Sequence, residues 1–289
     1  MSLRSAFHNL GRVIHDASFV LQDTCPPGEK IKTLSQLARI GLLPTPQRGG
    51  SAVVGRRNFR IKYLDHAPFW EAYHEIFMRQ IYFFRAETDT PFIVDCGANV
   101  GVASLYFKTL YPRCTIEAFE PDPLTFSVLK ENISFNSPAG INLHQGALWD
   151  SEGEVDFYTG SIPGSLGMSA FRERLAGDET KVSVPAVCLS RFLEGKNIDF
   201  LKLDVEGAEG RVLCDLEQTK TLGRIRQMVI DYHHPGNGTP YQLGQLLTSL
   251  EERDFACEVY AYLRPQAFRD PLHEVLIFAR RKAGQAASV

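Results

Sequence analysis

The acidic and glycine residues between positions 92 and 121 have the spacing of a nucleoside-binding unit. An apolar run ends at Asp95, a loop with Gly97 and Gly101 follows, and a second apolar run ends at Glu120. Glycines let the backbone approach a ligand closely, and the first N–H groups of the next helix lack partners within that helix. An acid after the second strand of a βαβ unit is placed to bind a ribose diol. The pattern therefore predicts a nucleoside site, with adenosine as the natural ligand.

A dinucleotide is the alternative ligand for such a loop. Gly97 and Gly101 are separated by three residues, whereas the pyrophosphate fingerprint is G-x-G-x-x-G, which directs a helix N-terminus and backbone N–H groups at two phosphates. The spacing argues against a nicotinamide oxidoreductase.

A second acidic segment, Lys202 to Glu209, follows a later apolar run. Carboxyl ends of parallel strands meet at one edge of a sheet, so we expect this segment beside the first loop. If the strand continued through it, Asp204 and Glu206 would share a side, and one could contact a cofactor while the other faces an acceptor hydroxyl. Alternatively, Glu206 caps the following helix, and Lys202 and Glu209 form a structural ion pair.

The run Asp231-Tyr-His233-His234 comes after the next predicted strand. A histidine of near-neutral pKa could accept the proton of a sugar or polyketide hydroxyl, although both histidines could instead be structural or exposed. Asp204, Asp231 and His233 could also bind a divalent cation, but a metal is not expected because no compact ligand motif is present. The candidate catalytic residues are Asp204, Glu206 and His233.

Strands and helices alternate from residue 91 onward, which requires a parallel sheet. The predicted strands end at Asp95 and Phe119 or span residues 141–144, 198–203 and 227–231, with helices near 101–111, 123–135, 207–216 and 240–253. An antiparallel pair, 255–262 and 274–279, is expected to close the sheet. A hairpin (155–158 with 182–187) and its mobile loop, residues 159–169, are predicted as an insertion.

The segments before the sheet are predicted as additions to it. Residues 1–57 are expected to form a mainly helical extension, and residues 58–90 a strand and an aromatic helix, from about Pro68 to Phe84, that cap the core. The spacing of Phe69, Tyr73 and Phe77 favours core packing, although a lid or a sugar-stacking surface is the alternative. Residues 91–282 would be the binding domain and 283–289 a flexible tail.

Composition excludes several classes of protein. The formal net charge is −3 with both signs interspersed, which disfavours nucleic acid as a partner. No apolar run reaches the roughly 20 residues of a membrane span. The six cysteines are scattered without zinc spacing. We therefore expect a cytoplasmic protein with free thiols.

The motifs Asp95-Cys-Gly-Ala-Asn-Val-Gly101, Glu120-Pro121 and Lys202-Leu-Asp-Val-Glu-Gly-Ala-Glu209 resemble the FkbM-type family of S-adenosylmethionine-dependent methyltransferases. The resemblance implies the class I methyltransferase fold, a Rossmann-like α/β sheet of seven mostly parallel strands with a reversed last strand. It also implies S-adenosylmethionine as cofactor and methyl transfer to oxygen.

By this resemblance, the loop at Gly97 to Gly101 would lie along the methionine, Glu120 would hold the ribose hydroxyls, Ala147 and Leu148 would face the adenine, and Asp204 would lie near the methyl donor. The candidate cofactor-binding residues are these together with Asp95, Ala98, Asn99 and Pro121. The acceptor would be a hydroxyl of a saccharide or small natural product. A catalytically silent nucleoside-binding or scaffold protein is the alternative, and a homo-oligomer is conceivable.

Overall fold

The computed structural model describes residues 3–22, 25–42, 48–159, 180–234, 242–261 and 275–282. The predicted mobile loop at residues 160–169 and the tail at 283–289 lie outside these ranges. No helix in the described ranges is long and apolar enough to cross a membrane.

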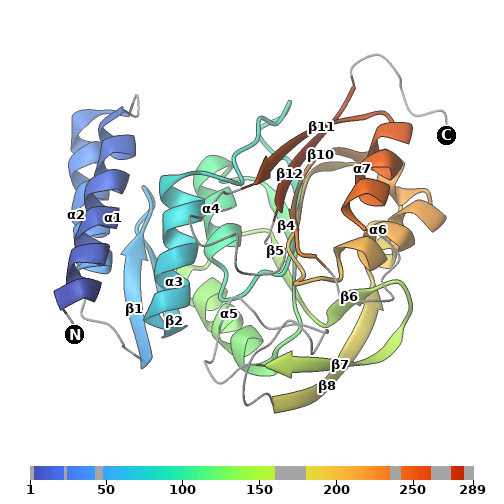
Figure 1. Ribbon diagram of the computed structural model, residues 1–289, viewed down its shortest axis with the longest axis horizontal. Helices are drawn as coiled ribbons and strands as arrows, with labels where there is room; N and C mark the ends of the chain where they lie inside the picture. Colours follow the sequence, from blue (N-terminus) through green and yellow to red (C-terminus); the bar gives the residue numbers. More distant parts are fainter. Residues whose placement is uncertain are drawn as a thin grey trace.

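A seven-stranded sheet in the order β11-β12-β10-β9-β3-β4-β5 forms the centre of the molecule (Figure 1). Its strands are β3 (Phe92–Cys96), β4 (Thr115–Glu120), β5 (Ile141–Gln145), β9 (Ile198–Leu203), β10 (Ile225–Tyr232), β11 (Phe255–Ala261) and β12 (Val275–Arg281). All neighbours pair in parallel except β12, which is antiparallel to β10 and β11. The predicted mostly parallel sheet with a reversed last strand is confirmed.

Helices cover both faces of this sheet. α4 (Val102–Leu110) and α5 (Pro123–Asn136) lie on one face, and α6 (Glu209–Gln218) and α7 (Leu243–Glu252) on the other. A hydrophobic core lies between the sheet and each pair of helices. Side chains of a strand alternate between the two faces, so Ile93 packs with α4 and α5 and Val94 packs with α6 and α7. β3 lies between β4 and β9, so the direction of strand progression reverses at β3, where α/β proteins bind ligands.

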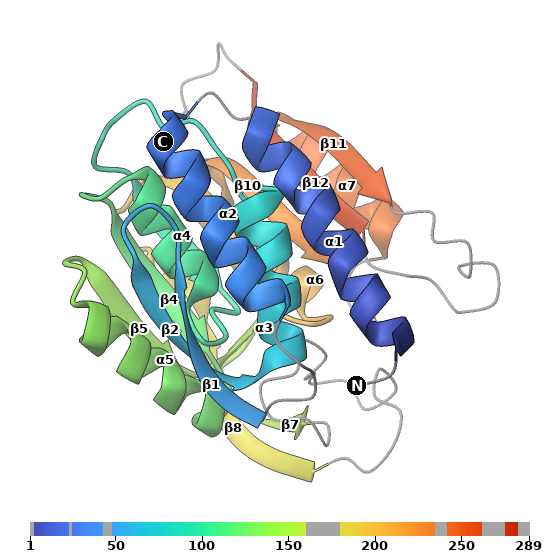
Figure 2. The same ribbon diagram turned by 90° about the vertical axis from the view of Figure 1, so that its left-hand side faces the viewer.

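The N-terminal helices α1 (Leu3–Gln22) and α2 (Pro27–Gly41) pack side by side at one end of the molecule (Figure 2). A hairpin of β1 (Arg48–Val54) and β2 (Phe59–Asp65) follows. The predicted boundary between residues 57 and 58 therefore falls in the turn between two paired strands. On α5, Asn132 and Asn136 each donate to and accept from the backbone of β2, at Lys62 and Arg60.

The predicted aromatic helix is shorter than expected. It comprises α3 (His66–Tyr73) and a π-helical turn, His74–Met78, and it ends before Gln80, which has a positive φ of 55°. Phe69, Tyr73 and Phe77 are at most 9% exposed. These three side chains pack in the core, as the sequence favoured.

All six cysteines are free.

The insertion is a second, three-stranded sheet in the order β6-β8-β7. It contains β6 (Ala147–Trp149), β7 (Gly153–Thr159) and β8 (Thr180–Cys188). The antiparallel β7–β8 pair is the predicted hairpin, whereas the parallel partner β6 was not expected. Through β6 this sheet reaches the carboxyl ends of the central strands.

Candidate functional site

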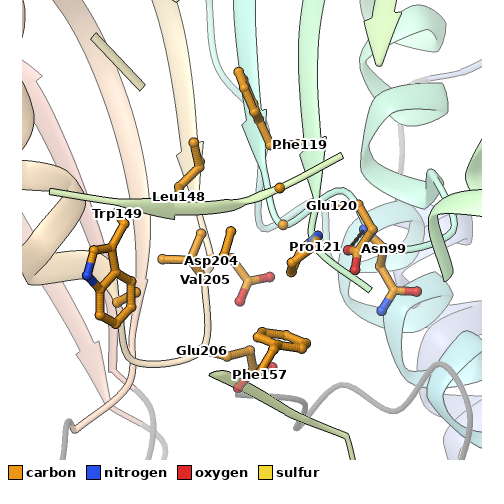
Figure 3. Close-up of a pocket in the computed structure, with 14 residues that line it drawn as sticks. Asn99, Phe119, Glu120, Pro121, Leu148, Trp149, Phe157, Asp204, Val205 and Glu206 are labelled. Carbon is orange, nitrogen blue, oxygen red and sulfur yellow. Dashed lines mark hydrogen bonds between the residues drawn. The ribbon is translucent and has the colours of Figure 1, made fainter. Parts of the chain in front are cut away.

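A cavity lies at the carboxyl ends of β3, β4 and β9. It is lined by Gly97, Asn99, Phe119, Glu120, Pro121, Gly146, Ala147, Leu148, Trp149, Phe157, Asp204, Val205, Glu206 and Ala208. In Figure 3, Glu120 and Asn99 lie on one side of this space, Trp149 on the other, and Glu206 and Phe157 close together between them. Acidic side chains therefore face a wall that is otherwise mostly apolar.

Gly97 marks the point where the first loop crosses the second acidic segment. Its φ is +81°, and a Cβ there would lie 1.8 Å from the carbonyl oxygen of Asp204. The N–H groups of Gly97 and Ala98 both donate to the carbonyl of Phe119. No residue with a side chain fits this crossing, so the loop packs directly on the strand ends.

Glu120 ends β4 with its carboxylate at the cavity. Its two oxygens accept from the backbone N–H groups of Asn99 and Asp122, each at 2.9 Å. Burial raises the pKa of Glu120 to about 8, because the charged form loses its hydration. Asp122 itself accepts from Thr125 and caps α5. Glu120 thus presents acceptor oxygens that hydroxyl groups of a ligand could reach.

Beneath the loop, Lys202 holds two carboxylates and the backbone together. Its Nζ lies 3.2 Å from Asp204, 3.5 Å from Asp95 and 2.7 Å from the carbonyl oxygen of Gly97. The Tyr82 hydroxyl donates to the same Asp204 oxygen at 3.3 Å. Burial opposes ionisation of Asp204, but Lys202 and other partners outweigh it and lower its pKa. Lys202 pairs here, rather than with Glu209 as the sequence allowed.

The segment after β9 is a turn, so the strand alternation expected for Asp204 and Glu206 does not apply. Glu206 has a positive φ of 57°, which is strained for a residue with a side chain. Glu209, fully buried, accepts from the N–H groups of Val205 and Gly207 and so fixes this turn. The carboxylate that holds the turn is therefore Glu209, and Glu206 instead lines the cavity.

His233 lies between two carboxylates. Its Nδ1 is 3.1 Å from Glu209 and its Nε2 is 3.4 Å from Glu206. Burial alone would lower the pKa of His233, but Glu206, Glu209 and Asp231 together raise it to about 10. The ring is therefore a buried cation at neutral pH, and this argues against a role as general base.

Ligand atoms from Asp204, Glu206 and His233 lie within 4.8 Å of one another, close enough to surround a cation. His233 binds a metal only as neutral imidazole, and Asp204 already faces Lys202. The geometry brings the three residues together, while their charges favour an ion-pair network.

Most of the predicted site residues meet at this cavity. Gly97, Asn99, Glu120, Pro121, Ala147, Leu148, Asp204 and Glu206 line it, whereas Asp95, Ala98, Gly101 and His233 do not. Asp95 is fully buried and accepts from Ser104 at 2.6 Å. Gly101 begins α4 with a φ of +94°. Asp95 therefore contacts α4, Gly101 forms the end of the loop, and neither residue lines the cavity.

Sequence reasoning identified Pro121, Ala147 and Leu148 but missed the aromatic part of the lining. Phe119 comes directly before Glu120, and Trp149 directly after Leu148, so proximity to predicted residues was their only signal. Phe157 comes from the insertion, and no local pattern links β7 to the central sheet. Tyr82, which contacts Asp204 across 122 positions, falls in the predicted aromatic segment, but no local pattern indicated this contact.

A second cavity borders the first loop and is also lined by residues of β2 and α3. It shares Gly97, Asn99 and Asp204 with the first cavity, and it is also lined by Ala98, Lys202 and Phe69. The two spaces therefore border the same loop and the same carboxylate.

Comparison with known proteins identifies the family. The family described as "Methyltransferase FkbM domain" matches residues 95–257, more than half of the chain. Methyltransferase sdnD from Sordaria araneosa is 34% identical over 215 residues, 63% of this chain and 80% of that protein. The 31-O-demethyl-FK506 methyltransferase FkbM of Streptomyces tacrolimicus is 29% identical over 249 residues, which are 73% of this chain and 90% of that protein.

A 2-O-methyltransferase, NoeI of Sinorhizobium fredii, is 26% identical over 155 residues, 48% of this chain and 63% of that protein. Among solved structures, a methyltransferase FkbM from Methylobacillus flagellatus KT aligns with 14% identity and a TM-score of 0.49. That alignment covers 92% of this chain and 59% of the other. The matched family region contains the glycine loop, Glu120 and the acidic turn. The chain is a methyltransferase with a Rossmann-like sheet, and it belongs to the FkbM family.

Proposed function

We propose that this protein is an S-adenosylmethionine-dependent O-methyltransferase that acts on a hydroxyl of a saccharide or small natural product. The observation that carries the proposal is Glu120, a buried carboxylate at the cavity whose described hydrogen bonds come only from backbone N–H groups. Each oxygen keeps an unused lone pair, and a ribose diol offers two donors.

The lining fits an adenosyl sulfonium better than a dinucleotide. No lysine or arginine is among the described residues of the first cavity, so no side-chain cation is available there for a pyrophosphate. Phe119, Pro121 and Leu148 offer apolar surface for a purine, and the carboxylates of Asp204 and Glu206 favour a positive sulfonium. When bound, S-adenosylmethionine supplies a methyl group that its sulfonium has already activated.

The second cavity offers room for the amino-acid end of the cofactor. It shares Gly97 and Asn99 with the first cavity, and Lys202 lies in its wall. In this assignment, Glu120 holds the ribose in the first cavity. The amino-acid end of the same molecule lies in the second cavity, and Gly97 borders both. Asp204, fixed by Lys202 and Tyr82, faces both spaces.

Glu206 is our candidate for the group that accepts the acceptor's proton. It lines the cavity, and its side chain is 18% exposed. Methylation of a neutral hydroxyl produces a strongly acidic protonated ether, so a carboxylate of ordinary basicity suffices as the base. His233 would hold Glu206 in place as a cation, and Glu209 would hold both His233 and the turn.

Oxygen as the methyl acceptor is supported by two relatives whose names state O-methylation, the FK506 enzyme and NoeI. The described lining of the site includes the carboxylates of Asp204 and Glu206. A hydroxyl acceptor beside Glu206 is consistent with this chemistry.

Calorimetric titration with S-adenosylhomocysteine tests the cofactor. We expect micromolar binding, no binding of NADH, and a loss of about 10-fold to 100-fold in affinity for Glu120→Gln. Glu117→Gln is the matched control, because Glu117 is a buried acid of the same strand that pairs with His144 and Lys196 and does not line the cavity. Equal losses in the two variants would remove Glu120 from the site.

Methyl transfer itself is tested with labelled S-adenosylmethionine and a panel of hydroxylated acceptors, with product detected by mass. Glu206→Gln should lower turnover by about 100-fold or more while S-adenosylhomocysteine affinity changes little. Glu252→Gln, an exposed acid on α7, is the control. Cofactor binding without any product would favour a catalytically silent protein of the same fold.

A further inference from the structure

A groove lies at the amino ends of β9 and β10, on the edge of the sheet opposite the candidate active site. It shares no lining residue with the two cavities at the carboxyl edge. Six basic side chains line it: Arg85, Arg224, Arg226, Arg280, Arg281 and Lys282. The lining also contains two acids, Glu87 and Asp199. This basic groove takes no part in the methyl transfer proposed above.

The basic residues of the groove come from three separate segments of the chain. Arg85 precedes β3, two arginines lie at or just before the start of β10, and residues 280–282 lie at the end of β12. Specific contacts join the first segment to the second. The Gln227 side chain donates to the carbonyl of Arg85 at 2.8 Å, and Arg226 pairs with Glu87. The fold therefore brings together positive charges that are far apart in the sequence.

Most of these positive charges have no carboxylate partner. Both acids of the groove lie beside one arginine, because Arg226 pairs with Glu87 and its Nε lies 3.9 Å from Asp199. Within the part of the chain that the structure describes, no ion pair involves the other exposed cations of the groove, which are Arg85, Arg224, Arg280 and Lys282. The groove therefore has an excess of positive charge that its own acids do not neutralise.

Arg281 is less exposed than the other five cations and is held in a fixed place. Its guanidinium donates to the carbonyls of Leu222 and Ile225 at 2.9 and 3.1 Å, and it stacks on the ring of Phe255 at 4.6 Å. Burial lowers the pKa of Arg281, but a guanidinium stays charged at neutral pH. Because carbonyl oxygens carry only partial charge, an anion in the groove would stabilise this residue further.

The charge of the groove indicates the size of the anion that fits it. Its six basic and two acidic side chains give a net formal charge of +4, whereas the whole chain has −3, so the remaining residues together carry −7. An extended polyanion such as a nucleic acid would meet this negative charge beyond the groove. A phosphate group carries about −1.5 to −2 at pH 7, so two linked phosphates roughly offset the charge of the groove.

We propose that the basic groove binds a diphosphate group. Arg224 and Arg280 would donate to its oxygens, since the planar fork of a guanidinium matches the geometry of a phosphate. Arg281 would add its charge from its fixed position. The group is either free inorganic pyrophosphate or the end of a nucleoside diphosphate. This site does not depend on the proposed function, because the residues of the two sites are different.

Calorimetric titration of the full chain tests the proposal, at neutral pH and low salt in a buffer free of divalent cations. We expect inorganic pyrophosphate to bind one-to-one with a Kd of about 10–100 μM, and inorganic phosphate to bind at least about tenfold more weakly. Saturating S-adenosylhomocysteine should leave the pyrophosphate affinity unchanged. Uridine diphosphate separates the two sources: equal affinity indicates free pyrophosphate, and tighter binding indicates a nucleotide.

Variants locate the binding. Arg224→Gln and Arg280→Gln, both at exposed positions, should each weaken pyrophosphate binding about fivefold, because each removes one charge-assisted hydrogen bond. Glu87→Gln should strengthen binding, because it releases Arg226. The controls are Arg57→Gln and Glu252→Gln, which change the net charge equally at exposed positions outside the groove and should have no effect. The proposal fails if pyrophosphate does not bind, if phosphate binds equally well, if S-adenosylhomocysteine displaces pyrophosphate, or if the controls match the groove variants.

Discussion

At the scale of single residues, the charge of the candidate site is set by burial and by close partners. Glu120 and His233 are both at most 4% exposed. Burial is the largest influence on Glu120 and raises its pKa despite the opposing effect of Lys202, whereas adjacent carboxylates overcome the effect of burial on the pKa of His233. Both pKa values are therefore raised, so that at neutral pH the free protein holds Glu120 mainly as the neutral acid and His233 as the cation.

The pH dependence of cofactor affinity should report on Glu120. Its pKa in the free protein is about 8, and hydroxyl groups bond more strongly to the ionised form. Binding then releases a proton below that pH, so affinity should rise with pH and become constant above it. Calorimetry with S-adenosylhomocysteine across this range measures the effect. In Glu120→Gln the dependence should vanish, and an unchanged slope would assign the titration to another group.

The pH dependence of stability should report on His233. Its pKa is about 10 in the folded protein, against about 6.5 in the unfolded chain. Because the folded state binds this proton more tightly, the stabilisation is complete below about pH 6.5 and is lost as pH rises to about 10. Urea unfolding of the wild type and His233→Gln over this window should converge with rising pH. The neighbouring His234→Gln is the control, and a constant difference for His233→Gln would contradict the ion-pair network.

At the scale of elements, the cavity depends on a close crossing of two loops at the carboxyl edge of the sheet. The loop after β3 and the turn after β9 touch at Gly97, whose Cα faces the carbonyl of Asp204. Lys202 then links the carbonyl of Gly97 to the carboxylate of Asp204. The position of one loop therefore fixes that of the other.

Gly97→Ala should disrupt this crossing. Its Cβ would lie 1.8 Å from a backbone oxygen, and φ is positive, so we expect a loss of roughly 2–4 kcal/mol in unfolding free energy and loss of S-adenosylhomocysteine binding. Gly244→Ala on α7 is the matched control, because no atom lies within 4 Å of its Cβ. It should gain about 0.5–1 kcal/mol. Urea unfolding compares the two, and a Gly97→Ala protein of wild-type stability would refute the crossing.

At the scale of the whole molecule, the N-terminal helices share a core with the sheet. Leu37 and Ile40 of α2 belong to the same buried cluster as Trp70 of α3 and Leu105 of α4. The hairpin is joined to α5 through Asn132 and Asn136. The predicted division into an extension, a cap and a binding domain stays a prediction, but this packing favours a single folding unit.

Calorimetric melting tests that unity. We expect one cooperative transition. Leu37→Ala should shift that whole transition to lower temperature and reduce the unfolding free energy by about 2–5 kcal/mol, because it leaves a void in a fully buried position. Ile31→Ala, on the same helix at a position that is 69% exposed, should have little effect. Two separate transitions, with only one of them shifted by Leu37→Ala, would mean that the extension folds independently.

The sequence alone was sufficient for the features that depend on neighbouring residues. Periodicity and turn residues predicted the parallel strands of the sheet. The spacing of Asp95, Gly97, Gly101 and Glu120 predicted the glycine loop and the acid that follows the second strand. These signals are local, since a strand, a tight turn and a helix start each depend on a few adjacent side chains. The length of the aromatic helix was overestimated because apolar residues continue past the point where Gln80 adopts a positive φ.

Only the tertiary structure decided how these parts meet. Tyr82 reaches Asp204, Phe157 enters the cavity from the insertion, and His233 becomes a cation between Glu206 and Glu209. Each of these contacts joins chain segments whose separation leaves no local pattern. Burial and the charge of partners arise from folding itself, so the protonation of His233 and Glu120 could not be read from their neighbours in the chain.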